Sequence, residues 1–270
     1  MKKIFAIASL LIFTLLAHAQ NREARNVDSF NRISFGVPGT VYVTQGNTEK
    51  LELEGSKEVL DRVETVVDGS NLKIRSKERW GDWNWGREDR ITVYVTIKEV
   101  RGLSVSGSGT METRTKISAG DLDLKVSGSG NLRAEIEANN VDSGVSGSGS
   151  LTLRGKCNNL ESSIGGSGDI EADISVANTF DMSISGSGKL VATGKASKVK
   201  TSISGSGRVR ALDLESDVCD VRISGSGSVE INVKSELNAT ISGSGSVNYK
   251  GNPNHVNANS SGSGKVRKVS

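Results

Sequence analysis

A four-residue string, Ser-Gly-Ser-Gly, recurs at a nearly constant interval through more than half of this 270-residue chain. Nine copies, the fourth of which reads Gly-Gly-Ser-Gly, follow one another at intervals of 18 to 21 residues and begin at Ser106, Ser127, Ser146, Gly165, Ser185, Ser204, Ser224, Ser242 and Ser261. A period of about 20 residues is typical of solenoids, in which each repeat forms one coil stacked on the previous coil. The repeat therefore constrains the fold more strongly than any other feature.

Apolar residues accompany the copies, which argues against a flexible Gly/Ser linker. Valine or isoleucine precedes every string except the last, where Ser260 stands. The second residue after each string is also apolar, from Met111 in the first copy to Val266 in the last. Around these positions apolar and polar residues alternate with a period of two, which indicates β-strands with one buried face.

We therefore predict an all-β fold, a parallel β-solenoid (single-chain β-helix) with coils of about 20 residues. The alternation around Ser185 places both glycines of the string toward the core and both serines toward solvent. Glycine inside a strand costs about 0.5–1 kcal/mol relative to alanine, so we expect a pinched or bent coil with no room for a side chain. Nine coils at about 4.8 Å would form a rod roughly 40 Å long, and the more polar last coil is predicted to be its C-terminal cap.

The first 19 residues have the pattern of a cleavable secretory signal. Lys2 and Lys3 precede an apolar run, and Ala17-His18-Ala19 matches the small-x-small pattern that signal peptidase cuts. Cleavage after Ala19 predicts export to the periplasm, the outer-membrane surface or the extracellular space. Loss of the two lysines lowers the formal charge from +3 to +1. A nearly neutral chain gives no electrostatic reason to expect a nucleic-acid partner. No later stretch is long and apolar enough to cross a membrane as a helix, so we expect no transmembrane segment in the mature chain.

The mature chain divides into a short N-terminal segment, residues 20–27, and a solenoid over residues 28–268. Residues 28–105 form an irregular all-β N-terminal part, and residues 106–268 form the nine regular coils. Phe35 to Val43 align with the repeat and predict an irregular first coil. Lys57 to Val63 fit one or two helical turns, and Asp68-Gly69 between two apolar runs predicts a hairpin.

All three tryptophans fall within six residues of the N-terminal part, at Trp80, Trp83 and Trp85. Exposed tryptophans commonly bind sugars or protein partners, because a flat apolar ring with an N–H donor suits both. We take these three as candidate ligand-binding residues. The alternative, that the loop folds over an open edge of the solenoid and the rings cover the core, stays open.

The two cysteines are predicted to be free, buried thiols rather than a disulfide. Cys219 falls in the repeat position of Val199 and Leu237, whereas Cys157 falls in a position of small residues, with Ala119, Ala138, Ala177 and Ala196. The two positions are three coils apart, roughly 14 Å along the axis. A disulfide needs Cα atoms within about 7 Å.

No catalytic, metal or cofactor motif stands out. His255 is the single histidine of the mature chain, and no serine is framed as Gly-x-Ser-x-Gly. Calcium-binding solenoids need aspartate in coil after coil, but the position of Asp169 otherwise holds mixed residues. Polysaccharide-cleaving β-helices need acids or basic clusters aligned on adjacent coils, whereas Glu171 and Glu230 are three coils apart. We expect no catalytic residue, no metal, no cofactor and no enzyme.

The repeat pattern Ile/Val-Ser-Gly-Ser-Gly-x-Val/Leu-x-Ala, the segment with Phe30, Ile33, Gly36 and Val41, and the secretory signal resemble one known family. It is the putative auto-transporter adhesin, head GIN domain family of Bacteroidetes-type bacteria, and the resemblance covers residues 28–268. It implies an envelope or secreted β-solenoid that binds a surface molecule, without a catalytic motif.

Three functions fit the sequence. The first is an exported, non-enzymatic binding or adhesion module whose partner is a surface glycan or an envelope protein. The second is a structural or scaffolding envelope protein without a localised ligand site. The third is a carbohydrate-active β-helix enzyme. The sequence leaves the oligomeric state open.

Overall fold

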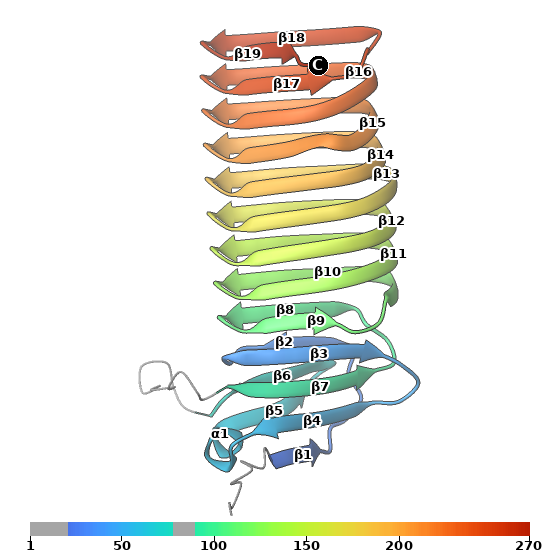
Figure 1. The fold of residues 1–270 in the computed structure, drawn as a ribbon, viewed down its shortest axis with the longest axis vertical. Helices are drawn as coiled ribbons and strands as arrows, with labels where there is room; N and C mark the ends of the chain where they lie inside the picture. The colour runs from blue at the N-terminus through green and yellow to red at the C-terminus, as the bar shows by residue number, and fades with distance from the viewer. Residues whose placement is uncertain (1–20, 78–89) are drawn as a thin grey trace, which may run out of the picture.

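The computed structural model describes residues 21–77 and 90–270 and shows a rod of stacked coils above an irregular base (Figure 1). The strands of the rod follow one another along the chain: β8 (Gly102–Gly107), β9 (Thr110–Thr113), β10 (Ile117–Gly128), β11 (Asn131–Gly147), β12 (Ser150–Gly166), β13 (Asp169–Gly186), β14 (Lys189–Gly205), β15 (Arg208–Gly225), β16 (Ser228–Gly243), β17 (Ser246–Lys250), β18 (His255–Gly262) and β19 (Lys265–Lys268). Neighbouring coils pair in parallel, so that Val126 lies level with Val145, and Val145 with Ile164. The predicted parallel β-solenoid is confirmed.

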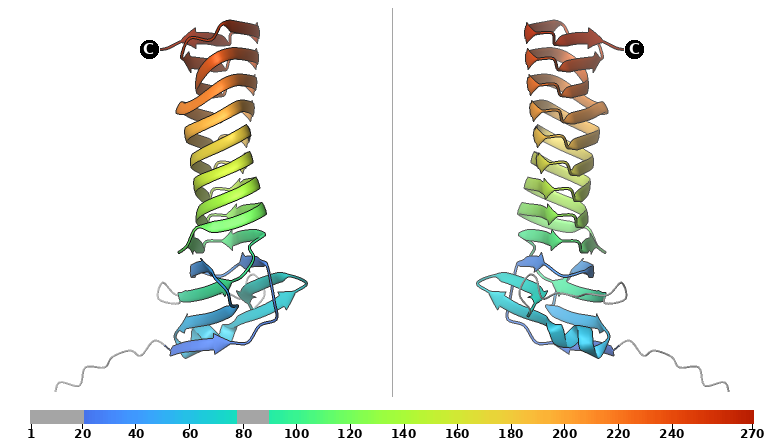
Figure 2. Two further views of the ribbon diagram at one scale, coloured as in Figure 1. Left: turned by 90° about the vertical axis from the view of Figure 1, so that its right-hand side faces the viewer. Right: turned by 90° about the vertical axis from the view of Figure 1, so that its left-hand side faces the viewer.

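Each coil is flattened between a glycine corner and a rounded edge (Figure 2). We call the part of a coil after its Ser-Gly-Ser-Gly string the first wall and the part before the next string the second wall. β11, for example, covers the first wall from Asn131, crosses the rounded edge and returns along the second wall to Gly147. The backbone register skips Asn139 and Asn158 at the rounded edge.

The core lies between the two walls and contains both predicted apolar columns. In the column that precedes the strings, every residue from Val105 to Ile241 is at most 2% exposed, and in the column that follows them, every residue from Met111 to Val247 is fully buried. Burial of each such aliphatic side chain contributes about 1.5–3 kcal/mol relative to an exposed one. The repeat thus stabilises every interior coil in the same way.

The glycine corner differs in one respect from the expectation that both glycines point inward. The first glycine of a string lies at the bend and is partly exposed, as at Gly186, where φ is +124°. A Cβ there would lie 2.5 Å from the carbonyl oxygen of Gly166, the equivalent residue one coil below. The second glycine, such as Gly188, is buried, and its Cβ would lie 2.5 Å from Ile164 Cγ2. Side chains are therefore excluded by the preceding coil rather than by the opposite wall, while both serines face solvent as predicted.

The base consists of short strands and a short helix: β1 (Asn21–Arg25), β2 (Arg32–Phe35), β3 (Gly39–Gln45), β4 (Lys50–Gly55), α1 (Lys57–Arg62), β5 (Val63–Asp68), β6 (Asn71–Ser76) and β7 (Ile91–Ile97). The predicted helical turns and hairpin are confirmed. The Ser56 hydroxyl caps α1 by accepting a hydrogen bond from the Val59 N–H, and β5 pairs antiparallel with β6 around Gly69.

The order of coils in the base does not follow the chain. β2 and β3 form the predicted first coil and lie directly against β8 and β9, with Phe35 level with Val105 and Val41 level with Met111. β6 and β7, which come later in the sequence, form the coil on the other side of β2 and β3. β4 and β5 then pair antiparallel with β7 and β6, and β1 pairs with β4. This inserted arrangement closes the N-terminal end.

The C-terminal coil is polar, as predicted, and open. All residues of β18 are exposed, and Val256, which continues the column of Leu237, is 41% exposed. Ser260 continues the column of Ile241, and its hydroxyl donates to the Gly264 carbonyl. The core therefore ends in a wettable coil.

Candidate functional site

The sequence-predicted site residues Trp80, Trp83 and Trp85 lie outside the described residues. The strands on either side of them are β6, which ends at Ser76, and β7, which begins at Ile91. In the next coil, Gly36 to Pro38 connect the equivalent strands β2 and β3.

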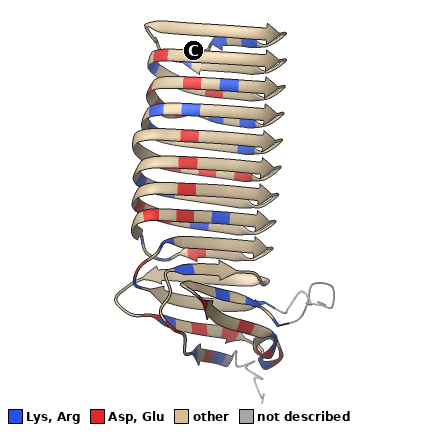
Figure 3. Ribbon diagram, turned by 180° about the vertical axis from the view of Figure 1, so that it is seen from behind, with Lys and Arg blue, Asp and Glu red and all other residues tan. Residues whose placement is uncertain are grey.

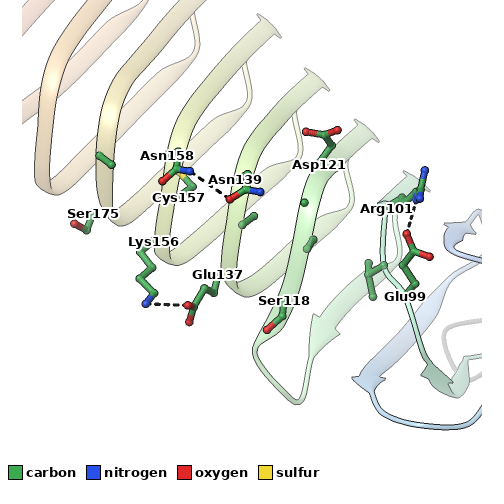
Figure 4. A pocket seen from close by; sticks show the side chains of 15 residues that line it. Glu99, Arg101, Ser118, Asp121, Glu137, Asn139, Lys156, Cys157, Asn158 and Ser175 are labelled. Carbon is green, nitrogen blue, oxygen red and sulfur yellow. Dashed lines mark hydrogen bonds and ion pairs between the residues drawn. The ribbon is translucent and has the colours of Figure 1, made fainter.

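The described residues form a groove of about 820 Å³ along the rounded edge (Figure 4). It extends over five successive levels, from the segment between β7 and β8 to β13. A smaller groove of about 360 Å³ shares Ser175 and Ala177 with it and continues along the same edge to Lys234 in β16. Together the two grooves form one long open groove parallel to the axis of the rod.

Small residues form the floor of this rounded-edge groove. Ala138 and Cys157 are 9% and 5% exposed and lie level with each other, in the column of Ala119. One predicted member of this column is wrong, because Val176 rather than Ala177 pairs with Cys157. The register shifts between Val176 and Thr179, so that the extra residue of that coil is taken up at the rounded edge.

Both cysteine thiols are free and buried. Burial raises the pKa of Cys157 to about 11 and that of Cys219 to about 12. A thiol with such a pKa is almost entirely protonated at neutral pH and is a poor nucleophile. Cys157 therefore contributes a small neutral surface to the groove floor rather than a reactive group.

One rim of the groove is a column of outward side chains, Ser118, Glu137, Lys156 and Ser175, in register from coil to coil. Lys156 Nζ lies 2.9 Å from Glu137 Oε1, and Lys116 Nζ lies 3.5 Å from Glu137 Oε2. The hydrogen bond from Lys156 holds the pKa of Glu137 below its usual value. Glu137 is therefore a carboxylate at neutral pH and lacks the raised pKa of a general acid.

The other rim carries amides. Asn158 Nδ2 donates to Asn139 Oδ1 over 3.3 Å (Figure 4). Immediately beside them, Asn159 Nδ2 donates to Asn140 Oδ1, and Asn140 Nδ2 donates to Asp121 Oδ1. These two amide ladders run along the axis, each step joining one coil to the next.

The charges that line the groove are mixed in sign. Glu99, Asp121 and Glu137 face it together with Arg101 and Lys156, and Arg101 Nε pairs with Glu99 Oε1 over 2.6 Å. Beyond the amide rim, the second wall is acidic over four coils, with Asp123, Asp142, Glu161 and Asp181 in register (Figure 3). The groove itself is therefore close to neutral. The adjoining acidic column keeps a net negative charge although Arg32 and Lys125 pair with Asp123, and this charge disfavours anions.

This groove was not predicted from the sequence, although one signal for it is present in the chain. The pair Asn-Asn occurs at residues 139–140 and again at 158–159, one repeat later. Glu171 and Glu230 lie outside this groove, on the first wall, three coils apart in one column as predicted.

The site offers hydrogen bonding rather than metal or nucleophile chemistry. Over residues 21–77 and 90–270, no group of three or more His, Cys, Asp and Glu side chains is arranged to hold a metal ion. His255 lies in β18, in the last coil, away from the groove. Nor does this part of the chain contain a helix long and apolar enough to span a bilayer.

Comparison with known proteins supports the solenoid fold. The chain is similar to a solved protein of Parabacteroides distasonis ATCC 8503 described as a putative lipid binding protein, with 24% identity, a TM-score of 0.69, and coverage of 94% of this chain and 98% of that chain. It is also similar to a putative adhesin from Parabacteroides merdae ATCC 43184, with 21% identity, a TM-score of 0.69 and the same coverages. At these identities the likeness shows the fold.

No curated protein matches the chain. The family described as "Putative auto-transporter adhesin, head GIN domain" matches residues 29–189 and 171–253, which is most of the chain. The chain therefore belongs to the putative auto-transporter adhesin, head GIN domain family.

Proposed function

We propose that this protein is an exported, non-enzymatic binding or adhesion module of the bacterial cell envelope. The observation that carries the proposal is the rounded-edge groove, an open polar surface of about 820 Å³ on a stacked β-solenoid. Rigid strands hold its rims, and a rigid scaffold lowers the entropy cost of binding. Membership of an adhesin family and the adhesin-like structural relatives support the same role.

The partner in this proposal is a surface glycan or an envelope protein. The secretory signal of residues 1–19, cut after Ala19, would deliver the mature chain to the periplasm, the outer-membrane surface or the extracellular space. Trp80, Trp83 and Trp85 are proposed as further ligand-binding residues, since tryptophan rings commonly stack on sugars or anchor protein partners.

A catalytic role has little support from the groove. Its carboxylate Glu137 is ion-paired with two lysines, whereas glycoside hydrolysis requires an acid of raised pKa facing a second carboxylate. The lipid-binding description of one structural relative fits the groove poorly, because charged and amide side chains form both rims.

The test is binding of the mature protein, residues 20–270, to isolated envelope fractions and intact cells, measured by co-sedimentation. Saturable binding without product release from a polysaccharide panel is the expected result. A folded protein that binds none of these fractions would contradict the proposal and favour a scaffold without a ligand site. Release of sugar products would favour an enzyme.

A further inference from the structure

We infer that the rounded-edge groove binds a neutral, linear glycan whose chain runs parallel to the solenoid axis. This inference rests on the proposed binding function and adds the class of ligand, its direction and its residues. Four observations lead to it: the repetition of the rims, their chemistry, their charge and the pairing of the strands beneath them.

The rims repeat once per coil. Ser118, Glu137, Lys156 and Ser175 are in register along one rim, and Asn139 and Asn158 follow one another along the other. Successive coils lie about 4.8 Å apart, so equivalent positions, which carry different polar side chains, recur at that spacing. A ligand that uses such a row must itself be a linear chain, and the continuation of the groove to Lys234 leaves room for several repeating units.

The chemistry of the rims suits hydroxyl and acetamido groups. Each asparagine amide has two N–H donors and an acceptor oxygen, and the ladder between Asn158 and Asn139 uses one donor and one acceptor. Both asparagines are exposed and line the groove, so the amide atoms outside this bond can bind a ligand. Serine hydroxyls and carboxylates on the opposite rim supply further donors and acceptors.

The charge of the groove argues for a neutral chain. Three carboxylates and two cations line it. Each cation is paired with one carboxylate, Arg101 with Glu99 and Lys156 with Glu137. A polyanion would also meet the acidic column of Asp123, Asp142, Glu161 and Asp181 on the adjoining wall (Figure 3). The smaller groove is balanced in the same way, with Lys195 and Lys234 beside Glu215 and Asp217. Lys234 is ion-paired with Glu215, so this groove offers a polycation no net attraction.

An extended peptide is a poor fit, because peptides usually add to a sheet through a free strand edge. The strands beneath the groove have no free edge: β11 pairs with β10 and β12, and β12 pairs with β11 and β13. Recognition here must come from side chains, which favours a ligand rich in hydroxyl groups.

The experiment titrates the mature protein with chito-oligosaccharides and cello-oligosaccharides of two, four and six sugars, with polygalacturonate as the anionic comparison. We expect at least one neutral series to bind, with the six-sugar member roughly tenfold or more tighter than the two-sugar member, because each added unit adds hydrogen bonds. Chito-oligosaccharides binding better would show that the acetamido groups contribute. A preference for polygalacturonate, or no dependence on length, would overturn the inference.

Three variants locate the site. The double variant Asn139→Ala/Asn158→Ala should weaken six-sugar binding roughly tenfold. Ser175→Tyr, at the residue shared by the two grooves, should reduce six-sugar binding to the level of the shorter chains. Asn257→Ala is the matched control, since Asn257 is exposed and also donates to the asparagine one coil below, Asn238, but lies outside the groove; it should bind as wild type.

Failure of this inference is distinguishable from failure of the binding function. If the Asn139→Ala/Asn158→Ala protein still binds envelope fractions as wild type does, the groove assignment is wrong and the binding function stands. If the wild-type protein binds neither the oligosaccharides nor the envelope fractions, both are wrong.

Discussion

The regular coils and the N-terminal base satisfy the hydrogen-bonding edges of their strands in different ways. From β11 to β15, each strand is paired on both sides by a strand of the same sequence pattern. The base instead uses an inserted coil, antiparallel strands and a helix that buries Val59 and Leu60. A repeat makes interior coils nearly interchangeable, whereas closing an end requires contacts that occur once. Substitutions in the regular coils and in the base should therefore change stability by different amounts.

The largest effect is expected for alanine at a glycine corner. Gly186 has φ +124°, and a Cβ there would lie 2.5 Å from the Gly166 carbonyl oxygen. Gly186→Ala should lower the free energy of unfolding by about 4 kcal/mol, from backbone strain and the displaced coil. Gly69→Ala in the β5–β6 hairpin also places alanine at positive φ, but nothing lies within 4 Å of its Cβ, so about 1 kcal/mol is expected. Equal shifts in the urea midpoints would show that the stacked coil imposes no extra constraint.

Truncation of a core side chain separates the interior of the rod from its open end. Ile203 is 1% exposed and Val256 is 41% exposed. Ile203→Ala should cost about 3 kcal/mol through lost burial and the cavity, and Val256→Ala less than about 0.5 kcal/mol. Thermal and urea unfolding of both variants measure this. A large loss for Val256→Ala would mean that something covers the last coil in solution.

Arg25 tests how the base is closed. Its guanidinium donates to the carbonyl oxygens of Val63 and Leu60, over 2.8 and 2.9 Å, and so holds β1 to the C-terminal end of α1. Arg25→Ala should cost about 2 kcal/mol and raise hydrogen exchange in β1, β4 and α1, but not in β11 to β16. Arg22→Ala is the comparison, because it removes an ion pair with Glu52 and the contact of the guanidinium with the Tyr94 ring but no bond to α1; it should change exchange less. Uniformly faster exchange through the rod would contradict independent closure of the base.

The buried thiols give a pH-dependent test. The folded-state pKa values of Cys157 and Cys219, about 11 and about 12, lie above the value of about 8.5 expected for an unfolded chain. The protonated thiols therefore contribute stability fully below about pH 8.5, and this contribution is lost as pH rises toward the folded-state values. We expect slow alkylation of the native protein at pH 8, rapid alkylation of two thiols in urea, and a falling urea midpoint above about pH 9. Rapid alkylation of the native protein would show that one thiol is accessible.

The smallest effect is expected at an exposed ion pair. Lys234 Nζ lies 2.7 Å from Glu215 Oε2 between two coils, and both side chains are more than half exposed. Such pairs are screened by solvent and salt. Lys234→Ala should leave the urea midpoint unchanged, and a clear loss of stability would mean that inter-coil ion pairs contribute more than we assign to them.

The sequence allowed the repeating part of the fold to be predicted well, because each position recurs and reveals its environment. The columns of Val105 and Met111 were recognisable for this reason. The orientation of the first corner glycine was not, since it depends on the distance to the carbonyl of the previous coil. The bulge after Val176 was also missed, because one extra residue can be accommodated anywhere in a coil.

The base and the groove were harder to predict for different reasons. The alignment of Phe35 with the repeat identified a coil, but no local signal shows that β6 and β7 lie beyond it in space. The groove results from small side chains beneath polar rims on several coils, which is a property of the surface rather than of a motif. The paired asparagines at residues 139–140 and 158–159 were its one visible sign in the chain.

The most direct test of the central claim compares envelope binding by proteins altered in each region. Wild-type mature protein, Asn139→Ala/Asn158→Ala, Trp80→Ala/Trp83→Ala/Trp85→Ala and Asn257→Ala would be titrated against the same envelope fraction, with β-sheet circular dichroism confirming that each is folded. We predict that the groove variant loses most of its binding, that the tryptophan variant is weakened less, and that Asn257→Ala binds as wild type. A groove variant that is folded and binds like wild type would contradict the claim that the regular coils carry the ligand.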